Sequence, residues 1–520
     1  MVRLLEVGLI GAVCVAVLAF GGTAPSFFAV AQVIILGLGV LFVLSGRFSR
    51  VTSAHIPIAS PLLLLALVLL QVCPLPVSLA PLFGRVPDDL VGESHFTVSM
   101  AQYQTVSHLL LLVSYLTAYF LTLALCRDRN AKRRLVFAIV SFGVFEALYG
   151  LIQYLTGWQQ IFAYVKKYYL EEATGTYINR NHFAGFLEMV LPFAVALTLR
   201  RTRILFQNPS SRTATLGKIA SRTEFLSLVF WLFLATLLFV ALVLSRSRMG
   251  IISALVSLIA ILALDGTASM RARTRAAVAA LLFLGVLGLV VWIGSDPVMS
   301  RFETLGQEYN FSGQNRISIW RDTLGLIRHH PLLGSGLGSF STVYPSVQTV
   351  FLTLLVEHAH CDYLEVASEL GLPGAILVFG SIFWVLAQTA CQYKKTEESF
   401  DKAVSLGCIG GIAAILVHSL ADFNLYIPAN ALVFTMILAL AWSNAHPGET
   451  SVGNAGKVLE AATREAGRRE DWTEPAPDAT FRMVDGGDAR GISQDFPDAE
   501  RLVKRLVARE LILSFVPDAE

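Results

Sequence analysis

The chain has 520 residues, of which 55% are hydrophobic and only 15% are charged. A mean hydropathy of +0.62 at this length excludes a soluble globular protein and indicates an integral membrane protein. The formal net charge is +2, and the basic residues are spread over several loops instead of forming one patch. We therefore expect no nucleic-acid partner.

Apolar runs of about 17–22 residues recur along the chain, each long enough to cross a hydrocarbon core of about 30 Å. They predict an all-α polytopic membrane protein with about twelve transmembrane helices. The first run resembles a signal peptide, but Arg3 is the only basic residue before it and no small-residue cleavage site follows, so we expect it to be retained. The predicted spans are 5–21, 27–45, 57–73, 106–126, 135–156, 183–199, 225–244, 249–265, 275–293, 371–391, 404–420 and 427–445.

The charges of the connecting loops predict the orientation of these spans. Every second loop is basic, which is typical of cytoplasmic loops, and the loops between them are acidic or mixed. The N-terminus and the C-terminus are then both cytoplasmic. The predicted cytoplasmic loops are 46–56, 127–134 (RDRNAKRR), 200–224, 266–274 and 392–403.

Residues 1–445 form the predicted membrane domain, and residues 446–520 form a predicted cytoplasmic tail. Residues 447–495 carry no hydrophobic run and are typical of a flexible segment. Residues 499–512 recover a helical period and predict a C-terminal amphipathic helix. Such a helix would lie on the inner leaflet, dock on a cytoplasmic partner or pack on the protein's own cytoplasmic face.

The predicted outer face collects the most polar residues of the membrane domain. Four segments contribute to it, and the third belongs to a long polar loop over residues 294–370 that we expect to be periplasmic. Because polar groups gathered at one membrane face are costly unless they bind or react, we interpret them as one functional site. The four segments are YINRNHFAG (177–185), SRSRMG (245–250), the loop residues Arg316 and HAHCDYLE (358–365), and HSLADFN (418–424).

The basic and amide residues of these segments allow two interpretations each. Arg246 and Arg248 either anchor span ends at the lipid headgroups or bind an anion, and two arginines in one short outer turn favour the anion, since guanidinium groups donate paired hydrogen bonds to phosphate. Asn179, Asn181 and His182 either cap the sixth span or contact a ligand. The segment PLLGSGLGSF (331–340) lacks the GK[ST] ending of a nucleotide loop, and its glycines indicate tight turns or close packing.

The histidines also have competing interpretations. His358 and His360 with Asp362 form a compact run that is not a standard zinc spacing, so a general base oriented by a carboxylate is favoured over a metal site. His418 and Asp422 are either a polar pair between spans or part of the pocket, with the structural role favoured. Glu146 and Glu188 lie within spans and should face the protein interior. Cys73 and Cys361 both lie on the predicted outer side and are candidates for a disulfide.

Taken together, these motifs resemble the O-antigen ligase family of bacterial membrane proteins. The resemblance rests on NRNHFAG with the following LP, on SRSRMG, on the run from Arg316 through Trp320 to HPLLGSGLGSF, and on HAHCDYLE followed by ELGLPG (369–374). It covers about residues 175–425. One departure is Cys361, because members usually carry Asn directly after the loop histidine.

The resemblance implies a metal-independent, inverting glycan transfer without a cofactor, at the periplasmic face of the bacterial inner membrane. The donor would be a glycan on undecaprenyl diphosphate, and the acceptor a hydroxyl of lipid A–core, of a growing glycan or of a protein. His360 would be the base, with Arg316 and Asp362 as further catalytic residues. The expected donor-binding residues are Arg246, Arg248, Arg180, Asn179, Asn181 and His182.

An O-antigen or exopolysaccharide polymerase would use the same donor and is the first alternative. A lipid or sugar transporter is an alternative of another class. Transporters usually place their functional polar groups near the membrane midplane and often consist of related halves. This chain shows neither feature, which disfavours a transporter.

Overall fold

The computed structural model describes residues 1–46, 59–83, 94–207, 215–265, 314–350 and 355–446. The chain divides into two units, Met1–Ser451 and Val452–Glu520. The predicted ninth span (275–293), the predicted tail and its amphipathic helix lie outside the described residues.

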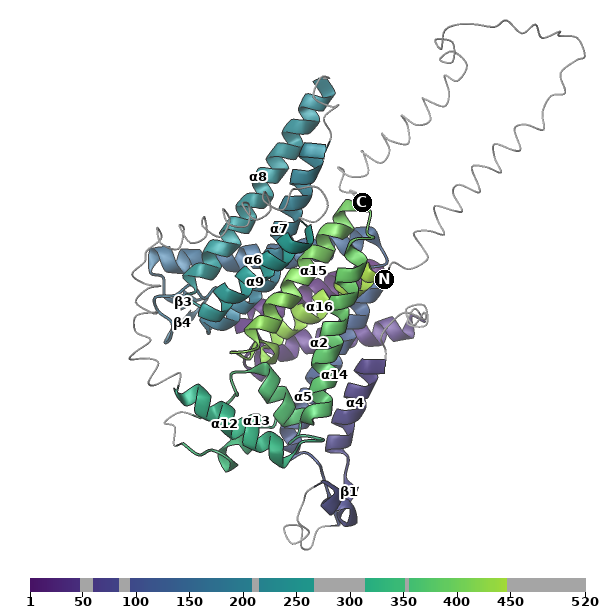
Figure 1. Ribbon diagram of the computed structural model, residues 1–520, viewed down its shortest axis with the longest axis vertical. Helices are drawn as coiled ribbons and strands as arrows, with labels where there is room; N and C mark the ends of the chain where they lie inside the picture. The colour runs from purple at the N-terminus through teal and green to yellow at the C-terminus, as the bar shows by residue number, and fades with distance from the viewer. Residues whose placement is uncertain (47–58, 84–93, 208–214, 266–313, 351–354, 447–520) are drawn as a thin grey trace, which may run out of the picture. The chain divides into compact units, whose positions relative to one another are not determined.

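The described part is mainly helical, as Figure 1 shows. The described part has two short two-stranded antiparallel sheets. In one, β1 (Leu75–Pro76) pairs with β2 (His95–Phe96), with Leu75 opposite Phe96. In the other, β3 (Gln160–Ile161) pairs with β4 (Tyr164–Val165), with Gln160 opposite Val165. The helices are α1 (Val2–Leu18), η1 (Phe20–Gly22), α2 (Pro25–Leu44), α4 (Ala59–Val72), η2 (Val77–Phe83), α5 (Gln102–Leu125), α6 (Arg129–Thr156), α7 (Arg180–Gln207), α8 (Thr215–Leu244), α9 (Arg248–Asp265), α12 (Gln314–His329), α13 (Phe340–Val343), η7 (Tyr344–Ser346), α14 (Asp362–Tyr393), α15 (Ser399–His418), η8 (Asn424–Tyr426) and α16 (Pro428–Ala445).

Nine helices of the described part are long and apolar enough to cross a membrane, which confirms a helical, multi-pass membrane protein. All nine coincide with predicted spans. The first predicted span forms α1, a helix of 17 residues, and the third forms α4, an apolar helix of only 14 residues. The total of about twelve spans therefore stays a prediction.

Three of the nine helices form the centre of the bundle. In α7, α15 and α16, 83%, 78% and 83% of the apolar stretch is buried, whereas the other six helices bury less than half of theirs. The helices α14, α15 and α16 pack side by side, and α7 packs against α15 (Figure 1). Small residues allow this close approach: a Cβ on Gly407 or Gly410 would lie 2.5 and 2.7 Å from Phe193 and Pro192.

The basic segments that were predicted to be cytoplasmic meet at one end of this bundle. Lys132 in α6 donates to Asp401 Oδ1 at 2.6 Å and to Asn444 Oδ1 at 2.9 Å. Arg200 near the end of α7 donates to Ser399 Oγ at 2.9 Å. Helix α7 ends at this side of the bundle and α15 begins there. The start of α7, which carries His182, and the end of α15, which carries His418, therefore lie at the opposite side. Both residues were predicted for the outer face.

The predicted long loop ends earlier than expected. We predicted a loop over residues 294–370 and a span from residue 371, but α14 begins at Asp362. The ELGLPG segment is a kink inside this helix: Gly371 has φ 71° and ψ 173°, and Leu372 N donates to Pro331 O instead of continuing the helical pattern. Hydropathy missed the first turns of α14 because their polar residues are buried within the protein and not in lipid.

The orientation in the membrane can be tested by labelling single cysteines in a cysteine-free background. Ser346 in η7 and Glu397 before α15 are both exposed and belong to opposite ends of the bundle. We expect Ser346→Cys to react with an impermeant maleimide in intact spheroplasts and Glu397→Cys to react only after lysis. Labelling of Glu397→Cys from outside would show that the protein has the opposite orientation in the membrane. Ser247 is unsuited to this test because it is buried.

Candidate active site

The turn that carries His360 is fixed on both sides, while His360 itself adopts an unusual backbone conformation. Glu365 in the first turn of α14 accepts a hydrogen bond from Ala359 N at 2.8 Å, and its Oε1 lies 2.7 Å from His358 Nδ1. Trp320 in α12 donates from Nε1 to Ala359 O at 2.9 Å. His360 has φ 52°, in the left-handed region that non-glycine residues rarely occupy. Such strain persists where surrounding contacts impose it, often at functional sites.

Phe423 joins three predicted segments at this turn. The rings of His182, His358 and His360 lie around its ring, with centroid distances of 4.9, 4.1 and 5.0 Å. His182 comes from α7, the other two histidines precede α14, and Phe423 lies between α15 and α16. Segments more than 200 residues apart in the sequence therefore share one site.

The buried carboxylate of Asp362 holds the turn between α15 and α16. Asp362 Oδ2 accepts from Ser419 Oγ at 2.7 Å and from Leu425 N at 3.4 Å, and its own backbone N–H donates to Ser419 O and Asp422 O. Asp362 was predicted as a catalytic residue. These contacts show that Asp362 positions the turn, and its catalytic role stays a prediction.

We expect Asp362→Ala to lower the free energy of unfolding by about 1–3 kcal/mol, because the Ser419 hydroxyl and the Leu425 N–H would lose their acceptor. Thermal unfolding in detergent micelles measures this change, and His360→Ala is the control that should leave the unfolding temperature near that of the wild type. Loss of activity with an unchanged unfolding temperature would show that Asp362 has a catalytic role.

Arg316 and Asp422 set the charge around His360. Arg316 in α12 donates from a terminal nitrogen to Ala421 O at 2.9 Å. Burial and the nearby Arg316 charge lower the pKa of His360 to about 4, and Asp422 opposes them only in part. His360 is therefore neutral at physiological pH and able to accept a proton. Its Nδ1 is buried and has no hydrogen-bond partner among the described residues.

His358 and Asp422 favour their charged forms, whereas His360 favours its neutral form. Burial opposes protonation of His358, but Glu365 outweighs it and raises the pKa of His358 above its usual value. Burial alone would raise the pKa of Asp422, yet His418, His182 and His360 surround it and hold its pKa below the usual range. Asp422 is thus an ionised carboxylate near the neutral His360. The distance of 3.8 Å between Asp422 Oδ2 and His418 Nε2 is too long for a hydrogen bond.

The predicted anion-binding arginines differ in their contacts. Arg180 donates to the buried carboxylate of Glu172 at 2.6 Å, and its guanidinium lies 5.3 Å from the centre of the Tyr169 ring. Arg246, with φ 55°, donates at 3.1 Å to Glu171, whose side chain is 80% exposed. Because an exposed ion pair contributes little, Arg246 can exchange Glu171 for an anionic ligand more readily than Arg180 can release Glu172. Arg248 begins α9, two residues after Arg246 in the sequence.

The amide cluster at the start of α7 both caps the helix and borders the site. Asn179 Oδ1 accepts from Asn181 N at 2.9 Å, which confirms the capping interpretation. Asn179 Nδ2 also lies 3.4 Å from His182 Nε2. The side chain of Asn181 is half-buried in the first turn. The same group therefore fixes the helix end and the His182 ring.

Other sequence predictions are confirmed as packing features. Glu146 accepts from Thr176 N and Oγ1, and Glu188 pairs with His418 at 3.0 Å, so both glutamates face the protein interior. In PLLGSGLGSF, a Cβ on Gly334 would meet the backbone of Glu369 at 2.2 Å, so this glycine allows close packing on α14. The pairing of Cys73 with Cys361, which the sequence left open, is not formed, since both cysteines are free. Within the described ranges, no group of three His, Cys, Asp or Glu residues is placed to hold a metal ion.

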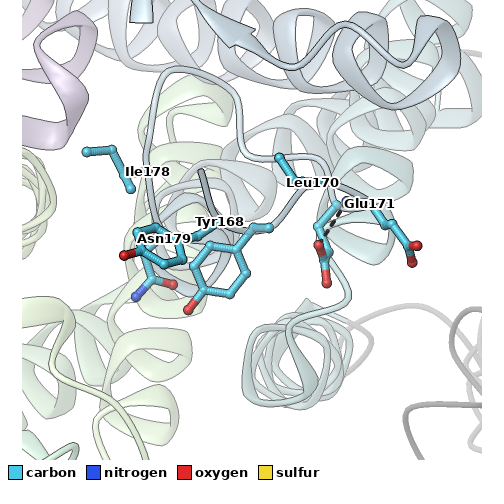
Figure 2. Close-up of a pocket in the computed structure, with 7 residues that line it drawn as sticks. Tyr168, Leu170, Glu171, Ile178 and Asn179 are labelled. Carbon is cyan, nitrogen blue, oxygen red and sulfur yellow. Dashed lines mark hydrogen bonds between the residues drawn. The ribbon is translucent and has the colours of Figure 1, made fainter. Parts of the chain in front are cut away.

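An open hollow of about 580 Å³ lies next to this cluster, on the segment that leads into α7. Figure 2 shows Tyr168, Ile178 and Asn179 on one side and Leu170 and Glu171 on the other. Tyr169 and Glu172 complete the lining. Neither this hollow nor the role of Phe423 was predicted, because the run KKYYLEE (166–172) carries no motif and the contacts of Phe423 are tertiary.

The fold and the cluster define a multi-pass membrane protein with a polar site at one end of its helix bundle. Residues 232–379 match the family model described as O-antigen ligase, so this part of the chain is similar to that family. The match confirms the resemblance and includes Arg246, Arg316 and His360, whereas His182, Asp422 and Phe423 lie outside it. No curated protein matches the chain.

Proposed function

We propose that this protein transfers a glycan from undecaprenyl diphosphate to an acceptor hydroxyl, in a reaction of the O-antigen ligase type. The family domain supports glycan transfer of the ligase or polymerase kind in general. The observation that carries the finer proposal is the neutral, half-buried imidazole of His360, with its buried Nδ1, near the positive charge of Arg316. A group-transfer reaction with a diphosphate leaving group needs a base and an adjacent cation of this kind.

In the proposed reaction, the acceptor hydroxyl forms a bond to the anomeric carbon of the donor sugar while the bond from that carbon to the diphosphate oxygen breaks. The hydroxyl proton moves to the imidazole of His360, and the electron pair leaves with undecaprenyl diphosphate. Arg316, Arg246 and Arg248 stabilise the charge of the leaving diphosphate. Attack opposite the leaving group inverts the configuration of the anomeric carbon.

The proposed location is the bacterial inner membrane, with the site facing the periplasm. This follows from the basic segments at the opposite end of the bundle and from the donor, which is presented on the outer leaflet in the family that the chain resembles. The acceptor is lipid A–core in the ligase reaction and a growing glycan in the polymerase reaction.

Deletion of the protein from its host distinguishes these acceptors through the surface polysaccharide. For a ligase, we expect O-antigen to be lost from lipid A–core while lipid-linked polymer accumulates. Loss of long chains with single repeats retained would identify a polymerase instead. An unchanged surface polysaccharide with unchanged lipid-linked intermediates would contradict both proposals.

We also expect the activity to survive EDTA and to need no added divalent cation. The proposed reaction uses Arg316, Arg246 and Arg248 where other glycan transferases use a metal ion to neutralise the diphosphate. The measurement is glycan transfer by purified protein with and without chelator. Loss of transfer with EDTA and recovery with zinc or magnesium would support a metal site at His358, His360 and Asp362.

A further inference from the structure

The hollow beside the catalytic cluster has the size and the exposure of a binding site. Its volume of about 580 Å³ lies within the range of about 300–1,000 Å³ that is typical of small-molecule sites. Tyr168 and Leu170 are 67% and 47% exposed, so a tyrosine and a leucine are presented to solvent side by side at its edge. Tyr169, the residue between them, has φ 55°, in the left-handed region. The side chains on either side of it therefore point in directions that a regular strand or helix does not allow.

The lining combines apolar faces with hydrogen-bond acceptors. Tyr168, Leu170 and Ile178 offer apolar contact, while Glu171, Glu172 and Asn179 offer carboxylate and amide oxygens. A sugar ring has the matching chemistry, since its C–H face packs on an aromatic or aliphatic side chain and its hydroxyl groups donate to oxygens. Arg180 and Arg246 pair with the two carboxylates of the lining and balance their charge, which fits a neutral ring.

The hollow is connected to the catalytic cluster through two of its lining residues. Asn179 lines it and lies 3.4 Å from the ring of His182. The phenol of Tyr169 interacts electrostatically with Arg316 and Asp422. The Arg180 guanidinium lies over its ring, 5.3 Å from the ring centre. A molecule in the hollow is therefore next to the groups that were proposed above to carry out the transfer.

The Glu171–Arg246 pair couples the hollow to the proposed diphosphate site. Arg246 has a buried Nε without a hydrogen-bond partner among the described residues, and a terminal nitrogen donates to the exposed carboxylate of Glu171 at 3.1 Å. When a diphosphate binds this guanidinium in place of Glu171, the carboxylate of Glu171 can accept hydrogen bonds from hydroxyl groups in the hollow. Occupation of one site thus favours occupation of the other.

We propose that the hollow lined by Tyr168, Leu170, Glu171 and Asn179 binds a neutral saccharide ring next to the transferred bond. This inference rests on the proposed function, because it places a sugar of the donor or of the acceptor there. Both sources share the chemistry of a hydroxyl-rich ring with an apolar face.

Saturation-transfer difference NMR on the purified full-length protein in lipid nanodiscs tests the proposal with two probes. One is the single-repeat oligosaccharide of the host's surface polysaccharide, and the other is the host's delipidated core oligosaccharide. We expect one of them to give a signal that falls about five- to tenfold in Tyr168→Ala, because the aromatic platform is lost. Tyr168→Phe should retain the signal. Tyr103→Ala, which changes an 82% exposed tyrosine on α5, is the matched control.

Each outcome separates the proposal from its alternatives. A Tyr168-dependent signal from the repeat oligosaccharide assigns the hollow to the donor glycan, and one from the core oligosaccharide assigns it to the acceptor. If neither probe gives a signal that Tyr168→Ala lowers, the proposal is wrong. Tyr168-dependent binding in a wild-type protein that transfers no glycan would contradict the proposed function but support the saccharide site, and His360→Ala should bind the saccharide without transferring it.

Discussion

The substitution His360→Ala is expected to reduce glycan transfer by about 10²–10⁴-fold, the range of a lost general base, while the lipid-diphosphate donor still binds. The loss would lie in the chemical step because Arg316, Arg246 and Arg248 remain to hold the diphosphate. Transfer assays and donor-binding measurements on the purified protein distinguish the two steps. His360→Asn is the matched variant, since Asn tolerates the left-handed backbone that His360 adopts but cannot accept the proton.

The pH dependence gives an independent check on the same residue. A general base must be neutral, and burial and Arg316 lower the pKa of His360 to about 4. The value of kcat/KM, which reports the free enzyme, should therefore be flat on the acid side down to about pH 5 and should fall near pH 4. In Arg316→Gln this acid limb should move to higher pH, because the cation that opposes protonation is gone. A wild-type limb near the ordinary histidine pKa of about 6.5 would contradict the assignment.

His358 is the internal control for this prediction. Its pKa is raised by Glu365, and its ring stacks on Phe423, so it favours the protonated state and serves the packing of the turn. His358→Ala should lower activity less than His360→Ala does. If His358→Ala abolished transfer while His360→Ala retained most of it, the base would have to be reassigned.

The second large effect is expected from Arg316→Ala, which should lower kcat/KM for the donor by about 10²-fold or more. Arg316 donates to the Ala421 carbonyl and provides a positive charge that lowers the pKa of His360, so we expect its loss to affect both the turn and the leaving group. Arg316→Lys should restore only part of the activity, because an ammonium group cannot make the paired contacts of a guanidinium.

Arg321→Ala is the matched control for Arg316, since Arg321 is an exposed arginine on the same helix. It should leave donor binding and transfer near their wild-type values. An equal loss in the two variants would show that a general change in surface charge is responsible, and it would contradict a specific role for Arg316.

Hydropathy predicted the described membrane helices well because an apolar run of sufficient length has few alternatives to crossing the membrane. It failed at the start of α14, where Asp362 and Glu365 are polar but are buried within the protein. A hydropathy scale measures transfer to lipid, so it does not distinguish such a turn from a solvent-exposed loop.

The candidate site was predicted in part. The segments that carry His182, Arg316, His360 and His418 were recognised from their polar composition, and the structure brings them together. Asp362 was interpreted as a catalytic partner because it neighbours His360 in the sequence, yet its carboxylate bonds to Ser419 and Leu425. The importance of Phe423 and of the hollow at residues 168–172 depends on tertiary contacts, which no local pattern records.

Transfer by the purified protein tests the central claim most directly. The full-length protein in lipid vesicles would be given a synthetic glycan on undecaprenyl diphosphate together with the host's lipid A–core, and the anomeric configuration of the product would be determined by NMR. We predict release of undecaprenyl diphosphate and a product of inverted configuration, with neither formed by His360→Ala. A product of retained configuration, or transfer that continues unchanged in His360→Ala, would contradict the mechanism.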